Sequence, residues 1–68
     1  MRVDYFEDTD TLQVTFKDTI VVDTRDLDED TLVETDADGQ LVSITIEHAR
    51  DRTDLESFLF RRHAGSVA

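Results

Sequence analysis

The chain has 68 residues, with seven basic residues against seventeen acidic ones and a net charge of −10. This length predicts a single domain, residues 1–68, with a small apolar core, and the lack of cysteine excludes disulfide bonds and thiolate metal sites. The negative charge repels phosphate groups, so we do not expect the acidic body of the domain to bind nucleic acid.

The sequence contains no long apolar segment. Its longest apolar runs, 20–22 and 58–60, have three residues each, and Met1 is not followed by a basic segment and then an apolar one. A bilayer-spanning helix needs about 20 apolar residues, and a secretory signal needs about 7–15. We therefore expect a cytoplasmic protein that does not enter membranes.

The acidic excess lies in the first part of the chain. Residues 1–47 carry fourteen acidic and three basic residues, whereas residues 48–68 carry three acidic residues and four arginines. Such a surface is typical either of a protein that binds a basic partner or of a protein adapted to concentrated salt. Aspartate outnumbers glutamate twelve to five and Lys17 is the sole lysine, which favours a halophilic, archaeal source. Molar salt shortens the Debye length to about 3 Å, so we expect salt to stabilise the fold.

Alternating apolar and polar residues predict the β-strands. The expected strands are 2–6, 11–16, 20–24, 31–35 and 41–47. Alternation is clearest in 11–16, where Leu12, Val14 and Phe16 share one side of the strand. The charged segment 25–30 is predicted to be a solvated loop whose Leu27 returns to the edge of the core.

Residues 36–40, Asp-Ala-Asp-Gly-Gln, predict the turn of a β-hairpin between the last two strands. On the second of these strands Val42, Ile44 and Ile46 share one side, and His48 is expected to continue it. The aspartates of the turn resemble the start of an EF-hand loop, but the spacing of the later ligands does not match. A turn is therefore the better interpretation of this segment.

The period of the apolar residues changes after residue 49. Thr53 and Glu56 have the spacing of a helix capping box, and Leu55, Phe58 and Leu59 form one stripe at helical spacing. We predict a helix over 54–63 and a frayed tail over 64–68. Together these elements predict an α+β fold: an antiparallel β-meander of four to five strands, covered on one face by one C-terminal helix in a two-layer sandwich.

Phe60 falls outside the helical stripe. It either packs at the margin of the helix or anchors a second subunit, because exposed aromatic residues favour interfaces. The predicted candidate interface therefore consists of Phe58, Leu59, Phe60, Arg61 and Arg62.

The residue types that carry catalysis are scarce or badly placed. The chain lacks cysteine, Lys17 follows a strand in a polar segment, and the two glycines are too far apart for a phosphate-binding loop. We predict no enzyme activity, no catalytic residue and no cofactor. His48 with Asp51 offers too few ligands for a structural metal site, so no metal site is predicted.

Two stretches are similar to a family of short prokaryotic proteins, the domain of unknown function twenty-two eighty-three. They are 5–14, YFEDTDTLQV, and 32–46, LVETDADGQLVSITI, and Ala49 also fits the family's pattern. The resemblance covers about residues 3–50. It implies a small sheet-forming protein with no established activity, often encoded beside another small protein in an arrangement similar to toxin–antitoxin pairs.

Several functions remain open at this point. The leading hypothesis is a non-catalytic protein–protein interaction module, either a homodimer or an antitoxin-like partner of a small basic protein. The alternative is a weak divalent-cation-binding protein or a small enzyme that uses the acidic loops, such as Asp26, Asp28 and Asp30. A nucleic-acid binder would have to rely on the arginines of the C-terminal segment.

Overall fold

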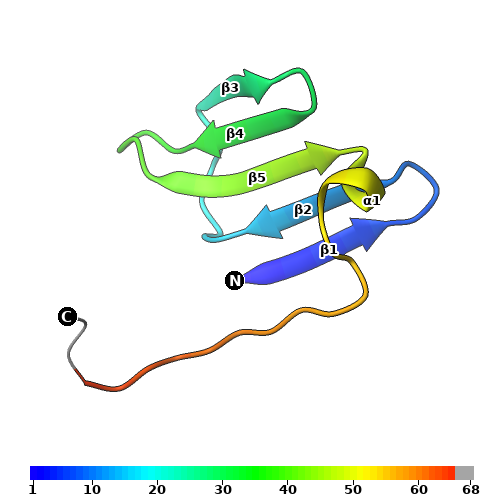
Figure 1. The fold of residues 1–68 in the computed structure, drawn as a ribbon. Coiled ribbons are helices and arrows are strands. Elements are labelled where there is room, and N and C mark those ends of the chain that lie inside the picture. Colours follow the sequence, from blue (N-terminus) through cyan, green and yellow to red (C-terminus); the bar gives the residue numbers. More distant parts are fainter. Residues whose placement is uncertain (66–68) are drawn as a thin grey trace.

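A computed structural model describes residues 1–65 of the chain. It contains a five-stranded antiparallel β-sheet and one short C-terminal helix (Figure 1). The elements are β1 (Arg2–Phe6), β2 (Thr11–Thr15), β3 (Asp23–Asp28), β4 (Thr31–Thr35), β5 (Leu41–Glu47) and α1 (Ala49–Arg52). The bounds predicted for four of the five strands agree with β1, β2, β4 and β5 to within one residue.

The strand order in the sheet is β1-β2-β5-β4-β3. The predicted simple meander is therefore wrong, because β5 lies in the centre and pairs with both β2 and β4. The connection between β2 and β3, residues 16–22, allows this order because it crosses the start of β5 and the end of β4. Phe16 donates its amide to the carbonyl of Val42 (2.7 Å), and Val22 donates its amide to the carbonyl of Thr35 (2.9 Å). The chain thus reaches the far edge of the sheet before β3 begins.

The third strand is displaced from its predicted position. It was expected at 20–24, but β3 covers Asp23–Asp28, and most of the segment predicted as a loop is a strand. Ile20 is 85% exposed and Leu27 is 71% exposed, so Leu27 does not return to the core edge. As an edge strand, β3 is held by main-chain hydrogen bonds to β4 and not by apolar side chains. Its pairing therefore does not follow the apolar pattern.

The register divides the sheet into an apolar and a polar face, because directly paired residues lie on the same side. The apolar face is defined by seven side chains: Val3, Tyr5, Leu12, Val14, Val33, Ile44 and Ile46. Thr31, opposite Ile46, and Arg25, opposite Val33, lie on the same side. The other, polar face carries Thr11, Gln13, Thr15, Glu34, Ser43, Thr45 and Glu47, with Leu32 opposite Thr45. All seven residues of the apolar face are only half-buried.

The predicted helix over 54–63 is not formed. The helix present is α1, four residues long, and the chain from Thr53 to Gly65 is extended or bent. Thr53 has φ −138° and ψ 161° and donates its hydroxyl to the carbonyl of Ala49 (2.8 Å), so it ends α1 and does not cap a second helix. A ten-residue helix is marginal in water unless its apolar stripe packs against a partner. Of the predicted frayed tail, residues 66–68 lie outside the described residues.

The sheet therefore lacks the predicted helical cover. In Figure 1 α1 lies at one end of the sheet, and the segment after it runs back along the β1 side. Among residues 1–65 the buried apolar side chains are Val42, which is 5% exposed, and Ala49, which is 0% exposed. No helix in this part of the chain is long and apolar enough to cross a membrane.

Candidate functional site

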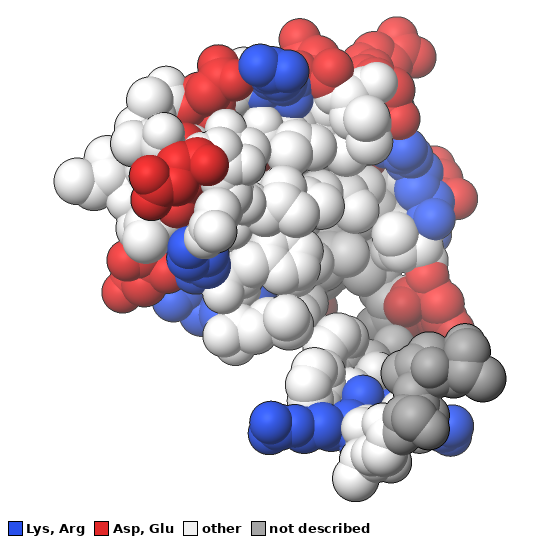
Figure 2. Space-filling view, turned by 90° about the vertical axis from the view of Figure 1, so that its left-hand side faces the viewer, with Lys and Arg blue, Asp and Glu red and all other residues white. Residues whose placement is uncertain are grey.

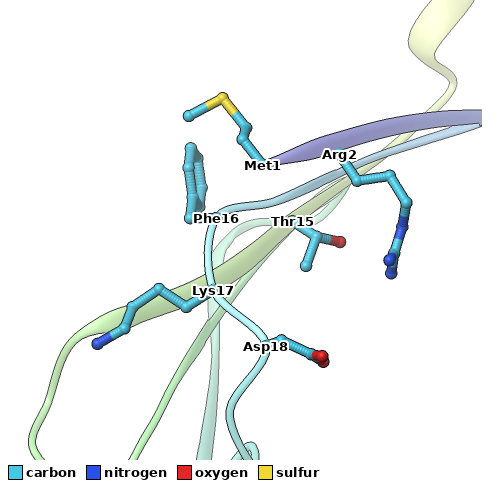
Figure 3. Close-up of a pocket in the computed structure, with 6 residues that line it drawn as sticks. All are labelled: Met1, Arg2, Thr15, Phe16, Lys17 and Asp18. Carbon is cyan, nitrogen blue, oxygen red and sulfur yellow. The ribbon is translucent and has the colours of Figure 1, made fainter.

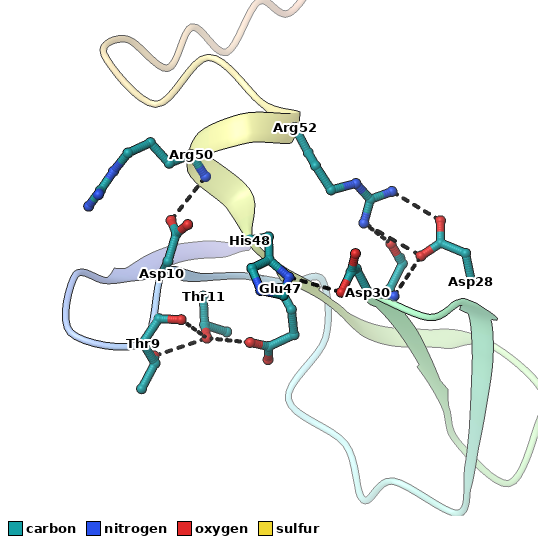
Figure 4. A network of polar contacts seen from close by, with 10 residues as sticks. Thr9, Asp10, Thr11, Asp28, Asp30, Glu47, His48, Arg50 and Arg52 are labelled. Carbon is teal, nitrogen blue, oxygen red and sulfur yellow. Dashed lines mark hydrogen bonds and ion pairs between the residues drawn. The ribbon is translucent and has the colours of Figure 1, made fainter.

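A polar cluster attaches α1 to the first hairpin (Figure 4). Asp10, at φ 55°, accepts the hydroxyl of Tyr5 (2.7 Å) and the amide of Arg50 (2.9 Å), and Arg50 donates its guanidinium to the Tyr5 oxygen (3.2 Å). The hydrogen bond from Tyr5 lowers the pKa of Asp10, and the same bond raises the pKa of Tyr5. The cluster fixes the position of α1 over β1.

A second polar cluster attaches the other end of α1 to the β3–β4 turn. Arg52 donates to Asp28 (3.0 Å) and to the hydroxyl of Thr31 (2.7 Å). The amide of Asp30 also donates to Asp28 (2.9 Å), and this bond is the main reason why the pKa of Asp28 is lowered. Hydrogen bonds from the two arginines of α1 thus hold the helix in place, with Arg50 bonded to β1 and Arg52 bonded to β4.

His48 does not continue the Ile44 and Ile46 side of β5 as predicted. Its φ of 55° is left-handed and turns the chain out of β5, which places Nδ1 3.0 Å from the carboxylate of Asp30. The hydrogen bond that His48 donates to the Asp30 carboxylate, together with the negative charge of that carboxylate, raises the pKa of His48. His48 is thus paired with Asp30, which is not the residue considered from the sequence, Asp51.

Asp36, a carboxylate of the segment that resembles an EF-hand loop, stabilises the hairpin turn. Asp36 accepts the amides of Asp38 (2.9 Å) and Gln40 (3.0 Å), and Gly39 has φ 76°, which confirms the predicted turn. These amides, that of Gln40 first, lower the pKa of Asp36. Within residues 1–65 no group of three or more His, Asp or Glu side chains could hold a metal ion.

A shallow cavity of about 370 Å³ lies where the N-terminus meets the end of β2 (Figure 3). Its lining residues are Met1, Arg2, Thr15, Phe16, Lys17 and Asp18. Figure 3 shows Lys17 pointing away from Met1 and Phe16. The Lys17 ammonium lies 3.6 Å from Asp36 and bonds to Gln40. Lys17 therefore supports the hairpin turn, and the cavity brings no activated nucleophile together with a base.

The apolar face is the other candidate site. The tail, residues 53–65, borders it along β1 and at Leu12 of β2. Phe58 and Phe60 line a cavity of about 420 Å³ together with Met1 and Val3. Leu55 and Phe58 line a smaller one, of about 150 Å³, that includes Tyr5 and Leu12. Neither cavity includes Val33, Ile44 or Ile46 of the inner strands.

The candidate interface predicted from the sequence lies entirely in the tail. Phe58, Leu59 and Phe60 are each about two-thirds exposed, at 68%, 70% and 65%, and Arg61 and Arg62 are exposed beside them. Figure 2 shows a broad uncharged area on the body of the protein, bordered by charged side chains, and a recess between the body and the tail.

Sequence reasoning named the tail but missed the apolar face as a site. The signal was present in the alternation of β1, β2 and β5, which makes an apolar surface too wide for one short helix to cover. Tyr5, Asp10 and Arg50 were also missed, because they lie up to 45 positions apart in the sequence.

The comparisons with known proteins bear on the sheet. A comparison with curated proteins finds no match, and a comparison with solved structures finds none. A comparison with protein families matches residues 2–50 to the family described as protein of unknown function DUF2283. The match includes all five strands and the start of α1. Since it extends over more than half of the chain, this protein belongs to the DUF2283 family.

Proposed function

We propose that this protein is a non-catalytic protein–protein interaction module that binds its protein partner through the apolar face. The observation that supports this most is a sheet with one apolar side and, within residues 1–65, no second layer over it. Domains normally bury such a face against a helix layer or another sheet. Here α1 has four residues and lies at one end, so the inner strands are left open.

The energetics support the same conclusion. Full burial of an aliphatic side chain such as Val33 or Ile44 contributes about 1.5–3 kcal/mol, and both are only half-buried in the isolated chain. A partner that covers the face would recover this free energy for several side chains at once. The two-layer arrangement predicted from the sequence then arises by association, with the partner in place of the helix.

The polar clusters support a binding role over a catalytic one. Asp10 is bonded to Tyr5 and Arg50, and Asp28 is bonded to Arg52. Carboxylates engaged in this way stay ionised and hold the end of the sheet in place. We propose that they keep the apolar face in a fixed shape, which lowers the entropic cost of binding.

Two variants on adjacent residues of β5 test the proposal. Ile44→Asp places a charge on the apolar face, and Thr45→Asp places the same charge on the polar face. Tagged wild-type, I44D and T45D proteins are purified at the salt concentration of the source cell. A stoichiometric bound protein, either a different chain or an untagged copy, is expected with wild type and T45D and is expected to be lost with I44D.

Circular dichroism of each variant is the control that the sheet still folds. If I44D is folded and retains as much bound protein as wild type does, the apolar face is not the binding surface. Failure of the wild-type protein to retain any protein, at low or high salt, would also contradict the proposal.

A further inference from the structure

We propose that the partner on the apolar face is a second copy of this chain, and that the two sheets pack face to face as a sandwich. This inference rests on the function proposed above and names the protein that covers the face. Three properties of the chain support it: its surface area, the charge on and around the apolar face, and the position of α1.

The surface area is too large for a compact monomer. A compact protein of 7.8 kDa exposes about 4,400 Å², whereas this chain exposes 5683 Å². The excess of about 1,300 Å² comes from the open sheet together with the extended tail. Obligate homodimers bury about 1,000–2,500 Å² on each subunit, so the excess has the size that such a dimer needs. The radius of gyration, 13.7 Å, also exceeds the value of about 11 Å for a compact chain of this length.

The charge of the apolar face allows two copies to meet although each carries a net charge of −10. None of the seven residues that define the face is charged. On β3, Arg25 lies on this side of the sheet, opposite Val33, and pairs with Asp23 at 2.8 Å. At the α1 end Arg52 lies 3.0 Å from Asp28. Arg50, whose guanidinium donates to the neutral Tyr5 hydroxyl, lies at the α1 end of the face. Association through the centre of the face therefore buries no charge of the seven defining residues, which avoids the main electrostatic cost of an interface.

The position of α1 determines how two copies fit. Both arginines of α1 bond to residues on the apolar side of the sheet, Tyr5 and Thr31, so α1 projects from that side at one end. A two-fold axis that runs across the strands places the two α1 helices at opposite ends of the sandwich, where they do not collide. The sheets then cross at about 30° with a separation of about 10 Å.

The same two-fold axis places β3 opposite β3 of the partner copy. This strand is exposed along its whole length, and of its three aspartates Asp23 is paired with Arg25 and Asp28 with Arg52. The repulsion between the copies therefore comes from the net charge of −10 on each chain; it weakens the dimer in dilute buffer and is screened at about 1 M salt, where the Debye length is about 3 Å. Salt is therefore expected to strengthen this association. Binding of a basic foreign partner would show the opposite dependence, because salt screens attraction between opposite charges.

Analytical ultracentrifugation of the full chain in 0.1 M and 2 M KCl tests the proposal. We expect a monomer–dimer equilibrium that shifts toward dimer in high salt. The I44D variant should weaken dimerisation at least about 30-fold, as for a central interface residue, and T45D should leave it within a few-fold of wild type. Val14→Thr, which keeps side-chain size, is a milder variant if I44D does not fold, and it should also weaken the dimer.

The absence of cysteine allows a geometric test. Ile44→Cys and Thr45→Cys each introduce a single thiol, on the apolar and the polar face respectively. A bismaleimide reagent with a reach of about 10 Å is expected to join two copies through position 44 and not through position 45. Equal cross-linking at both positions would show that the copies do not meet through the apolar face.

A chain that stays monomeric in 2 M KCl at millimolar concentration overturns the inference. If the wild-type protein still binds a different protein, and I44D does not, the interaction function stands and only the second copy is ruled out. If no protein binds in either experiment, both proposals fail.

Discussion

Removal of the tail should leave the stability of the sheet nearly unchanged. A chain that ends at Glu56 keeps all five strands, α1 and Leu55, but loses Phe58, Leu59 and Phe60. These three side chains are 65–70% exposed, so about a third of their surface is shielded from water. The unfolded chain itself hides about 10–40% of its apolar surface. The tail therefore adds little, and we expect the free energy of unfolding to change by less than about 1 kcal/mol.

A helix over 54–63 that covers the sheet would give a very different result. It would bury Leu55, Phe58 and Leu59, and each buried side chain contributes about 1.5–3 kcal/mol. The total of about 5–9 kcal/mol is similar to the whole stability of a domain of this size, about 3–10 kcal/mol. A chain ending at Glu56 would then be largely unfolded.

Urea unfolding followed by circular dichroism, in 2 M KCl at a single protein concentration, measures the difference. The full-length double variant Arg61→Gln, Arg62→Gln is the matched control, because it lacks the two arginines that the truncated chain also lacks. A loss of several kcal/mol in the truncated chain, with the double variant unaffected, would refute the extended tail and restore the helical cover.

Three further outcomes are expected. Gly39→Ala should destabilise the protein by about 1–2 kcal/mol in urea unfolding, because Gly39 has a left-handed φ of 76°. No atom lies within 4 Å of the added Cβ, so the whole cost comes from the backbone conformation. Equal stability of the variant and the wild type would contradict this turn. The pair of His48 with Asp30 should stabilise the fold fully below pH 6.5, and this stabilisation should be lost as the pH rises through the higher pKa that His48 has in the folded state. Asp30→Asn should lower the pKa of His48 in an NMR titration. An unchanged pKa would show that the pair is not formed in solution. The melting temperature should rise by several degrees between 0.1 M and 2 M KCl, and a constant value would argue against adaptation to salt.

The sequence determined the elements whose signals are local. In β1, β2 and β5 a period of two places apolar residues on one side, and this pattern is visible in five to seven consecutive residues. The turn at Asp36 and Gly39 is also local, since the side chain of Asp36 bonds to amides two and four residues later. The family resemblance gave the same sheet, and it too depends on short blocks of sequence.

The tertiary structure alone decided where these elements go and which side chains stay uncovered. The central place of β5 depends on pairing with β2, about 30 residues earlier, and the position of β3 depends on main-chain bonds to β4 that no side-chain pattern encodes. The capping box at Thr53 and Glu56 predicts a helix only if the apolar stripe after it finds a surface, and Thr53 instead ends α1. Local patterns report the free energy of a segment in isolation, whereas the order of strands and the exposure of the apolar face depend on contacts between segments far apart in the chain.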